Sequence, residues 1–177
     1  MKVIKKVISA LVGDYLELCT ADRELLMAAA KVRERAQAPY SKYKVGVAVV
    51  SSDTKTIYLG CNVERCSYTQ TTHAEQNAID SMVADRGAGK LITVALVGGP
   101  ETIVYKFPPK KTDESITEIE DVPVPCGHCL QIIWENCHND PNVRLLALAR
   151  NGEVVLTTIG DAFPMCFGPA DLGIDYT

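Results

Sequence analysis

The sequence predicts an α/β fold in which helices pack on the faces of a mixed β-sheet. Segments with helical periodicity alternate with five short runs that are rich in β-branched residues. Their order is helix, strand, strand, helix, strand, helix, strand, strand, which is typical of a layered α/β domain. The chain has 177 residues, of which 47% are hydrophobic and 23% charged. This composition is that of a globular protein with a real core, so we expect a single domain over residues 1–177.

The N-terminal segment, residues 1–18, is expected to form an amphipathic helix. Its early lysines and short apolar run are also found in signal peptides. However, Asp14 and Glu17 follow at once, and no small-residue cleavage site is evident. An amphipathic helix therefore explains the segment better than an export signal does.

The remaining elements are bounded by residues that begin or end helices and strands. Thr20 can cap a helix that Pro39 stops, and Gly87 can close a second helix. In chain order the predicted elements are a helix over 20–38, a hairpin of strands 43–52 and 55–64 with its turn at Ser52-Asp53, a helix over 73–87, a buried strand over 91–99, a helix over 126–138, and strands over 143–150 and 153–159.

An irregular insertion is predicted at about residues 100–122. It contains the charged run KKTDESITEIED, and five prolines lie in or next to it. The segment is long for a connection inside a compact domain. Segments of this kind usually serve as lids, binding loops or mobile tethers.

Composition excludes several classes of function. The formal charge is −4 and no basic cluster is interleaved with aromatic residues, which disfavours binding to DNA or long RNA. No run of about 18 apolar residues is present to span a membrane. The seven cysteines form no disulfide-like framework, which favours a reducing cytoplasm with thiols used as ligands or core residues. The class of function that remains is chemistry on a small molecule.

Two helix starts carry the residues of a metal site. Cys126 and Cys129 are three positions apart at the start of one predicted helix, so they share a face and can bind one ion together. His73 stands at the start of another helix, two residues before Glu75. One imidazole nitrogen and two thiolates suit Zn²⁺, and three protein ligands leave the fourth position open, as in catalytic zinc sites.

The pattern H-x-E…P-C-x-x-C is the signature of zinc deaminases. At these positions the chain resembles the cytidine deaminase family, and three further motifs extend the likeness over nearly the whole chain. They are PYSKYKVGVAVV, GCNVERCSY and FGPADLG. The resemblance implies a three-layer fold with a mixed five-stranded sheet and helices on both faces. It also implies a cytoplasmic enzyme of pyrimidine salvage that binds one Zn²⁺ per subunit and hydrolyses cytidine or deoxycytidine to the uracil nucleoside and ammonia.

Glu75 is the expected proton carrier. Deamination needs a strong nucleophile at neutral pH, which a zinc-bound water provides, and a group that moves protons to N3 and to the leaving amine. Residues i and i+2 of a helix do not share a face, so spacing alone does not direct Glu75 towards the metal. The resemblance does so, because the family's glutamate is an unligated neighbour of the zinc water.

The ligand set resembles one subgroup of the family. Smaller members have a third cysteine at the position of His73 and arginines at the positions of Gln76 and Leu130. These differences are mutually consistent, because a histidine ligand removes a negative charge that an arginine would offset. The motif around His73 is more similar to that of the larger, dimeric members, although their extra domain is absent from this sequence.

The resemblance also implies a substrate pocket. Asn62 and Glu64 match the pair that hydrogen-bonds the ribose hydroxyls, Tyr43 would flank the base, and the Ala74 N–H would reach the base carbonyl. Phe167 matches an aromatic residue that closes the site of a neighbouring subunit, which implies a homo-oligomer, a dimer or tetramer, with shared active sites. Without the resemblance, Asn62 and Glu64 would be residues of an ordinary turn.

Four alternatives remain open at this stage. A structural zinc site would need a fourth ligand, for which the candidates are His128, Cys137 and His138. A redox Cys-x-x-Cys pair lacks a thioredoxin-like context. The third alternative keeps the chemistry but acts on a modified cytosine nucleoside, such as the aminoacylnucleoside blasticidin S, or on a nucleotide. Its support is the insertion, whose lysines could meet a phosphate (Lys106, Lys110 and Lys111). The fourth is polynucleotide editing on the same fold.

Overall fold

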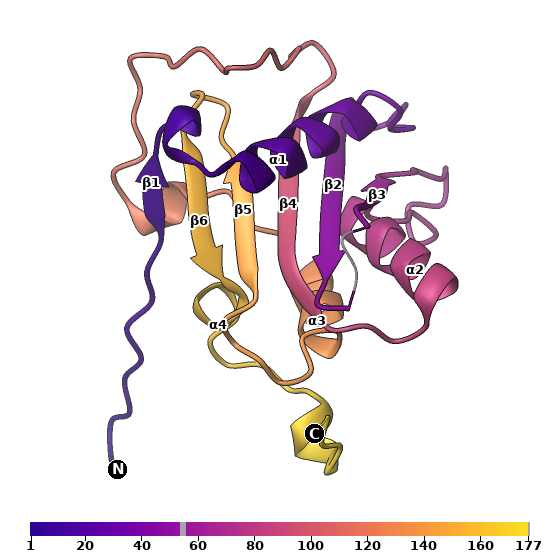
Figure 1. Ribbon diagram of the computed structural model, residues 1–177, viewed down its shortest axis with the longest axis vertical. Helices are drawn as coiled ribbons and strands as arrows, with labels where there is room; N and C mark the ends of the chain where they lie inside the picture. Colours follow the sequence, from indigo (N-terminus) through magenta and orange to yellow (C-terminus); the bar gives the residue numbers. More distant parts are fainter. Residues whose placement is uncertain (54–55, 177) are drawn as a thin grey trace.

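The computed structural model describes residues 1–53 and 56–176, and its centre is one six-stranded sheet (Figure 1). In chain order the strands are β1 (Leu11–Gly13), β2 (Tyr43–Ser51), β3 (Tyr58–Cys61), β4 (Leu91–Pro100), β5 (Arg144–Leu148) and β6 (Val154–Thr158). Across the sheet their order is β1-β6-β5-β4-β2-β3. The β4–β5 pair is parallel and the other neighbouring pairs are antiparallel. The sheet is therefore mixed, as predicted.

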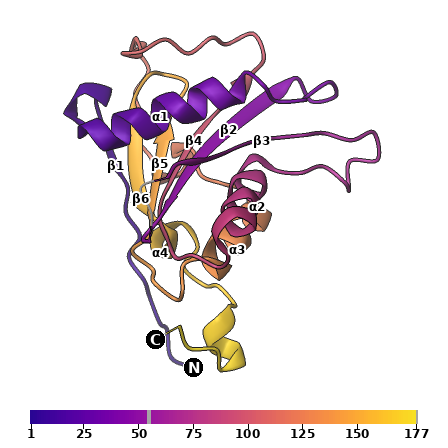
Figure 2. The same cartoon turned by 45° about the vertical axis from the view of Figure 1, so that its right-hand side comes forward.

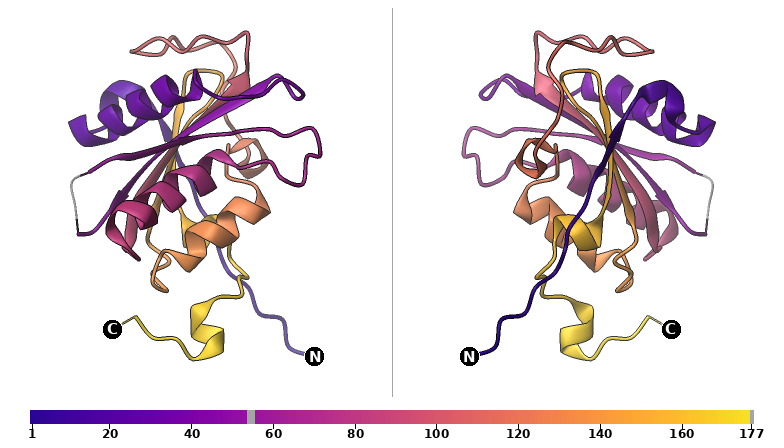
Figure 3. Two further views of the ribbon diagram at one scale, coloured as in Figure 1. Left: turned by 90° about the vertical axis from the view of Figure 1, so that its right-hand side faces the viewer. Right: turned by 90° about the vertical axis from the view of Figure 1, so that its left-hand side faces the viewer.

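Helices cover both faces of the sheet, which gives the expected three layers (Figure 3). Helix α1 (Thr20–Arg33) lies on one face. Helices α2 (Ala74–Arg86), α3 (Gly127–Glu135) and the short α4 (Ile159–Ala162) lie on the other. Short 3-10 turns occur at Tyr15–Glu17, Ile119–Asp121 and Pro169–Leu172.

The central strands are apolar on both faces because both faces are covered. In β4, Val94 and Leu96 belong to the core under α2 and α3, whereas Ala95 and Val97 belong to the core under α1. This explains the continuous apolar run that predicted a buried strand. Strand β2 also lies under α1. A Cβ at Gly46 of β2 would lie 2.1 Å from the Ala29 carbonyl oxygen, so glycine lets α1 approach the sheet.

The N-terminal segment corrects one prediction. Residues 1–10 form no helix, and Leu11–Gly13 pairs with β6 as a sixth strand. The Thr157 hydroxyl also donates to the Ser9 carbonyl oxygen at 2.7 Å. A short isolated helix is only marginally stable in water, whereas pairing with β6 supplies hydrogen bonds from the tertiary structure. The predicted five strands missed β1 because three residues carry no readable periodicity.

The other boundaries differ little from prediction. The N-cap of α1 is Cys19, one residue before the predicted cap Thr20. The helix begins at Thr20 and ends at Arg33, before Pro39. Gly87 closes α2 with a φ of 79°, as predicted. The first residue of the second hairpin run, Lys55, lies outside the described residues. None of the described helices is both long and apolar enough to cross a membrane.

The predicted insertion is the long irregular connection between β4 and α3. Residues 101–118 contain no helix or strand. In Figure 1 this segment passes over the ends of β4, β5 and β6 and then descends beside β1. It therefore lies at the end of the sheet where β4 and β5 finish.

Candidate metal centre and substrate cavity

The starts of α2 and α3 are brought together by close packing on the sheet (Figure 2). A Cβ at Gly60 would lie 2.3 Å from both the Ala74 carbonyl oxygen and the Ala78 nitrogen, so only glycine lets α2 rest directly on β3. His73 is the N-cap of α2 and Cys126 the N-cap of α3. The two caps are 53 residues apart in sequence and meet through this packing.

His73, Cys126 and Cys129 form a three-ligand cluster. His73 Nδ1 lies 3.5 Å from Cys126 Sγ and 3.3 Å from Cys129 Sγ, and the three ligand atoms are all within 4.8 Å of one another. Tetrahedral zinc with ordinary Zn–N and Zn–S bonds places a nitrogen and a sulfur ligand about 3.5 Å apart. The two nitrogen–sulfur distances therefore fit a zinc ion bound by these side chains.

The electrostatics of the cluster also favour a cation. Burial, the Glu75 charge and the neighbouring Cys126 raise the pKa of the Cys129 thiol far above its ordinary range. A thiol in that setting ionises only if positive charge is placed beside it. A divalent cation between two thiolates and a neutral imidazole meets that requirement and leaves no net charge among the ligands.

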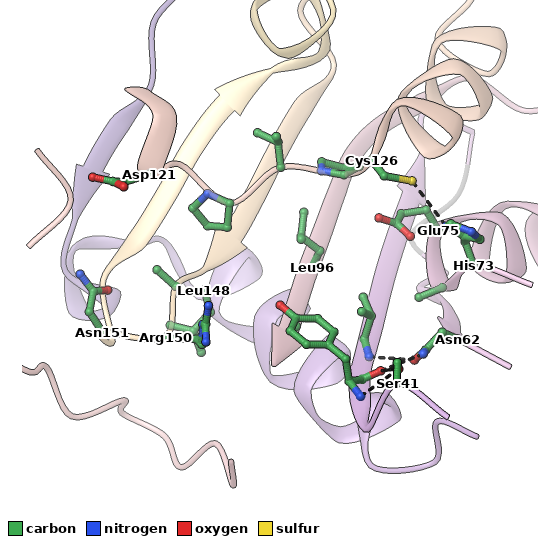
Figure 4. A pocket seen from close by; sticks show the side chains of 18 of the residues that line it. Ser41, Asn62, His73, Glu75, Leu96, Asp121, Cys126, Leu148, Arg150 and Asn151 are labelled. Atoms are coloured by element: carbon green, nitrogen blue, oxygen red, sulfur yellow. Dashed lines mark hydrogen bonds between the residues drawn. The ribbon is translucent and has the colours of Figure 1, made fainter. Parts of the chain in front are cut away.

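Glu75 lies next to the ligands. Its side chain is on the first turn of α2, the residue is only 6% exposed, and Oε2 is 3.2 Å from Cys129 Sγ. Figure 4 shows the carboxylate beside His73 and Cys126, pointing into the cavity. The tertiary structure thus supplies the orientation that the His-x-Glu spacing could not.

A cavity of about 1160 Å³ opens from this cluster. Its lining comes from β2, β4, the loop before α2, the insertion and the turn between β5 and β6. In Figure 4, Ser41 and Asn62 lie near the His73 end, whereas Arg150, Asn151 and Asp121 lie at the opposite end. The volume exceeds the range of typical small-molecule pockets, about 300–1,000 Å³.

Asn62 and Glu64 line the cavity and at the same time brace its wall. The Asn62 side chain accepts from the Val45 N–H at 2.8 Å and donates to the Tyr43 carbonyl oxygen at 3.0 Å. Glu64 Oε2 accepts from the N–H groups of Tyr40 and Ser41 at 3.0 and 3.2 Å, and Oε1 accepts from the Ser41 hydroxyl. Each side chain keeps unused lone pairs or protons for a ligand.

The Glu64 carboxylate is held in its charged form. Burial alone would raise its pKa, but the hydrogen bonds from the Ser41 hydroxyl and from the Tyr40 and Ser41 N–H groups outweigh burial and lower the pKa. A buried anion at this position is a strong acceptor for hydroxyl groups.

The other predicted contact residues divide into two sets. Tyr43 and Ala74 line the cavity, and the Tyr43 ring packs on Gly98. The Ala74 N–H belongs to the first turn of α2 and so has no acceptor within the helix. Phe167 is 60% exposed and does not line the cavity of its own chain.

The candidates for a fourth protein ligand lie elsewhere. The ring of the exposed His128 is tilted by 56° to the His73 ring, with 5.0 Å between the ring centres, the Cys137 thiol donates to the Ile133 carbonyl oxygen, and His138 stacks on Tyr176. None of the three joins the ligand cluster among the residues that the structure describes. Two members of the cluster, His73 and Cys126, also line the cavity.

The insertion lysines do not line the cavity either. Lys111 pairs with Asp14 at 2.9 Å and lies 3.8 Å from Glu153, and Lys106 and Lys110 are exposed. Sequence analysis missed several lining residues, including Ser41, Leu96, Arg150 and Asn151. Ser41 could have been predicted from the sequence, because it belongs to the PYS motif. The others carry no local signal, since they line the cavity only through the arrangement of the strands.

Comparison with known proteins identifies relatives over most of the chain. Residues 19–142 match the family model described as the cytidine and deoxycytidylate deaminase zinc-binding region. A cytidine deaminase of Sporosarcina psychrophila is 34% identical over 151 residues, which cover 84% of this chain and 93% of the relative. A cytidine deaminase of Photobacterium profundum is 31% identical over 139 residues, which cover 77% of this chain but 36% of that longer protein.

The fold is similar to that of a solved relative. The crystal structure of cytidine deaminase from Burkholderia pseudomallei superposes with a TM-score of 0.62 at 33% sequence identity, and the match covers 81% of this chain and 97% of that one. The chain therefore shares its fold with a solved cytidine deaminase, and the relatives named above are also cytidine deaminases.

Proposed function

The chain belongs to the cytidine and deoxycytidylate deaminase family, and we propose that it catalyses the zinc-dependent hydrolytic deamination of cytidine and deoxycytidine. The observation that carries this proposal is a cluster of three potential zinc ligands at the edge of a cavity, beside a buried glutamate that is not one of the three. Structural zinc sites use four protein ligands, so this arrangement supports catalysis.

The ligands are His73 through Nδ1 and the thiolates of Cys126 and Cys129. A zinc ion held by these residues would lower the pKa of a bound water to about 7 and would so supply a nucleophile at neutral pH. The two helix starts fix the ligands before metal binds, because both N-cap residues are held by helix packing on the sheet.

Glu75 moves the protons. Its carboxylate takes one proton from the attacking water and delivers it to N3 as C4 becomes tetrahedral. It then takes the second proton, from the new hydroxyl group on C4, and passes it to the amino group, so that the C4–N bond breaks, ammonia departs and the C4 carbonyl forms. The burial of Glu75 excludes bulk water from this transfer, and its position beside Cys129 keeps it within reach of the reacting atoms.

The remaining contacts orient the nucleoside. Asn62 and Glu64 would receive the sugar hydroxyls, the Ala74 N–H would donate to the base carbonyl, and the Tyr43 ring would flank the base. A site of this kind rejects analogues that lack the hydroxyls, because its buried polar groups would lose their partners.

Assembly and cellular role belong to the same proposal. The exposed Phe167 ring would close the cavity of a neighbouring subunit in a homo-oligomer, a dimer or tetramer, of single-domain chains with one zinc each. The enzyme would act in cytoplasmic pyrimidine salvage.

The decisive variant is Glu75→Gln, which keeps the side-chain shape but removes the proton carrier. We expect zinc to remain at one ion per chain and kcat for cytidine to fall by about 10²–10⁴-fold, the usual contribution of general acid–base catalysis. The measurements are the loss of ultraviolet absorbance of cytidine and a zinc assay on the same sample. Asp80→Asn, on an exposed position of the same helix, is the matched control. Full activity of Glu75→Gln would refute the proposal.

A further inference from the structure

We propose that the insertion, residues 101–118, is a fixed wall of the substrate cavity, and that Arg33 and Glu153 are positioning residues that clamp its two ends. The inference rests on the proposed function, because the cavity is taken as the substrate site. It assigns a role in substrate affinity to a segment and to two buried charges that the catalytic mechanism does not use.

The insertion contributes directly to the cavity. Thr112, Glu114, Ser115 and Ile116 line the same space as Glu75 and His73. A segment without helix or strand has few internal hydrogen bonds to fix it, so its position must come from contacts with the rest of the molecule.

The first clamp is the Arg33 guanidinium. Arg33 is 0% exposed, and its donors reach four backbone carbonyl oxygens. They are Lys44 at 3.2 Å, Gly99 at 2.8 Å, Pro100 at 2.6 Å and Ile103 at 3.0 Å. The guanidinium thereby links α1 to the start of β2, to the end of β4 and to the first residues of the insertion.

Two further contacts complete this clamp. Arg33 pairs with Glu34 at 2.6 Å, and its guanidinium lies 5.2 Å from the centre of the Tyr105 ring. The Tyr105 hydroxyl donates to the Gly98 carbonyl oxygen at 2.8 Å, and Gly98 is itself a cavity residue. Burying a cation costs free energy, and only well-placed hydrogen-bond partners offset that cost. The geometry of Arg33 is therefore coupled to the position of the backbone that it binds.

The second clamp is the Glu153 carboxylate in the turn between β5 and β6. Its Oε2 accepts from the Ile116 N–H at 2.9 Å and from Asn151 Nδ2 at 2.8 Å, and Lys111 lies 3.8 Å from Oε1. The Ile116 N–H, more than any other contact, lowers the pKa of Glu153, so the carboxylate is charged at neutral pH.

Backbone contacts reinforce this second end. The Thr112 N–H donates to the Asn151 carbonyl oxygen at 2.8 Å, and Asn151 Nδ2 donates to the Glu114 carbonyl oxygen at 3.1 Å. At Gly152, whose φ is +87°, a Cβ would lie 2.5 Å from the Lys110 carbonyl oxygen, so the turn touches the insertion directly. The wall is thus attached on both sides of its cavity-lining residues.

A released wall is expected to weaken substrate binding without changing the chemistry. If the segment occupies its cavity-lining position for only a fraction of the time, the apparent dissociation constant rises by the inverse of that fraction. The clamps do not touch the metal cluster or Glu75. Loss of a clamp should therefore raise KM and leave kcat and zinc content unchanged.

The test compares Glu153→Gln and Arg33→Lys with the wild-type zinc enzyme. Each should raise KM for cytidine about 5- to 20-fold, with kcat and zinc content within 2-fold of wild type. The double variant should show little more than the larger single effect, because a wall free at one end gains little from release at the other. Lys110→Ala, an exposed insertion side chain outside both clamps and the cavity, is the control and should leave KM unchanged.

A second readout does not depend on activity. Amide hydrogen exchange in residues 101–118 should be at least 10-fold faster in both clamp variants, with exchange in α2 and α3 unchanged. If either variant folds poorly, Tyr105→Phe removes one hydrogen bond of the first clamp and should show the same changes in smaller measure. An unchanged KM with faster exchange would overturn the inference. So would unchanged exchange, or a fall in kcat or zinc content without a rise in KM. An enzyme that binds zinc but leaves cytidine intact would instead refute the proposed function.

Discussion

Glu64 is a buried carboxylate whose hydrogen bonds connect two motifs that are far apart in the sequence. It accepts from Tyr40 and Ser41, which belong to the PYS motif, while Asn62 of its own motif holds the strand that follows PYS. The two motifs therefore depend on each other physically. The residues assigned to sugar binding also build the wall on which the sugar would rest.

The pH dependence of stability should report this carboxylate. The pKa of Glu64 is lowered in the folded protein, so its contribution is fully present above the unfolded pKa and is lost as pH falls through the folded pKa. We expect the difference in unfolding free energy between wild type and Glu64→Gln to be constant from pH 6 to 8 and to shrink below about pH 4.5. Urea denaturation at fixed pH measures it, and a difference that grows on acidification would contradict the assignment.

At the scale of elements, the contact between β3 and α2 places the candidate site residues at the start of α2. Gly60 lets the first turn of α2 rest on the strand, and that turn carries His73, Ala74 and Glu75. Because His73 precedes the helix and Glu75 is inside it, a displacement of α2 would move the proposed ligand and the proposed proton carrier together. The same strand continues into Asn62 and Glu64, so one contact aligns both halves of the site.

Gly60→Ala should therefore damage both stability and metal binding. Its Cβ would overlap backbone atoms at 2.3 Å, and overpacking of this kind costs about 1–3 kcal/mol or more. We expect a lower urea midpoint and weaker zinc retention against a chelator. Gly127→Ala is the matched control, because a Cβ there meets no atom within 4 Å. Wild-type zinc retention in Gly60→Ala would show that the α2 contact does not position the ligands.

At the scale of the whole molecule, the sheet brings together segments that are distant in sequence. The parallel β4–β5 pair places the turn after β5 near the insertion that follows β4. Phe167, near the C-terminus, is largely exposed and does not line the cavity of its own chain. Phe167 belongs to the FGPADLG motif, and the contact with another subunit that we propose for it rests on that motif.

Subunit complementation tests whether the active sites are shared. In the proposed assembly, Phe167→Ala and Glu75→Gln chains are each weakly active as homo-oligomers. Mixed oligomers should regain activity, because some sites then combine an intact Glu75 with an intact Phe167 from the neighbour. The measurement is cytidine turnover after the two variants are dissociated and reassembled together. Met165→Ala, at a more exposed position nearby, is the control. A mixture no more active than the average of its parents would argue against shared sites.

The sequence by itself determined the elements whose signals are local. The apolar run of 91–99, the glycine that closes α2 and the cysteines spaced for a helix start depend on neighbours a few residues away, and the structure agrees with them. The ligand types were readable for the same reason, since zinc chemistry restricts them to few residues. The family motifs pointed to Asn62 and Glu64, which no local pattern singles out, and both line the cavity; their part in sugar binding stays a prediction.

Only the tertiary structure decided the features that depend on distant contacts. The first strand pairs with β6 across more than 140 residues, so its three residues could not outweigh the helical appearance of the N-terminal segment. Glu75 lies beside the candidate ligands because α2 packs on β3, and the insertion lines the cavity while Arg33 and Glu153 hydrogen-bond to its backbone. In each case the deciding free energy comes from hydrogen bonds and close packing between segments far apart in the chain, and a short window of sequence contains neither partner's position.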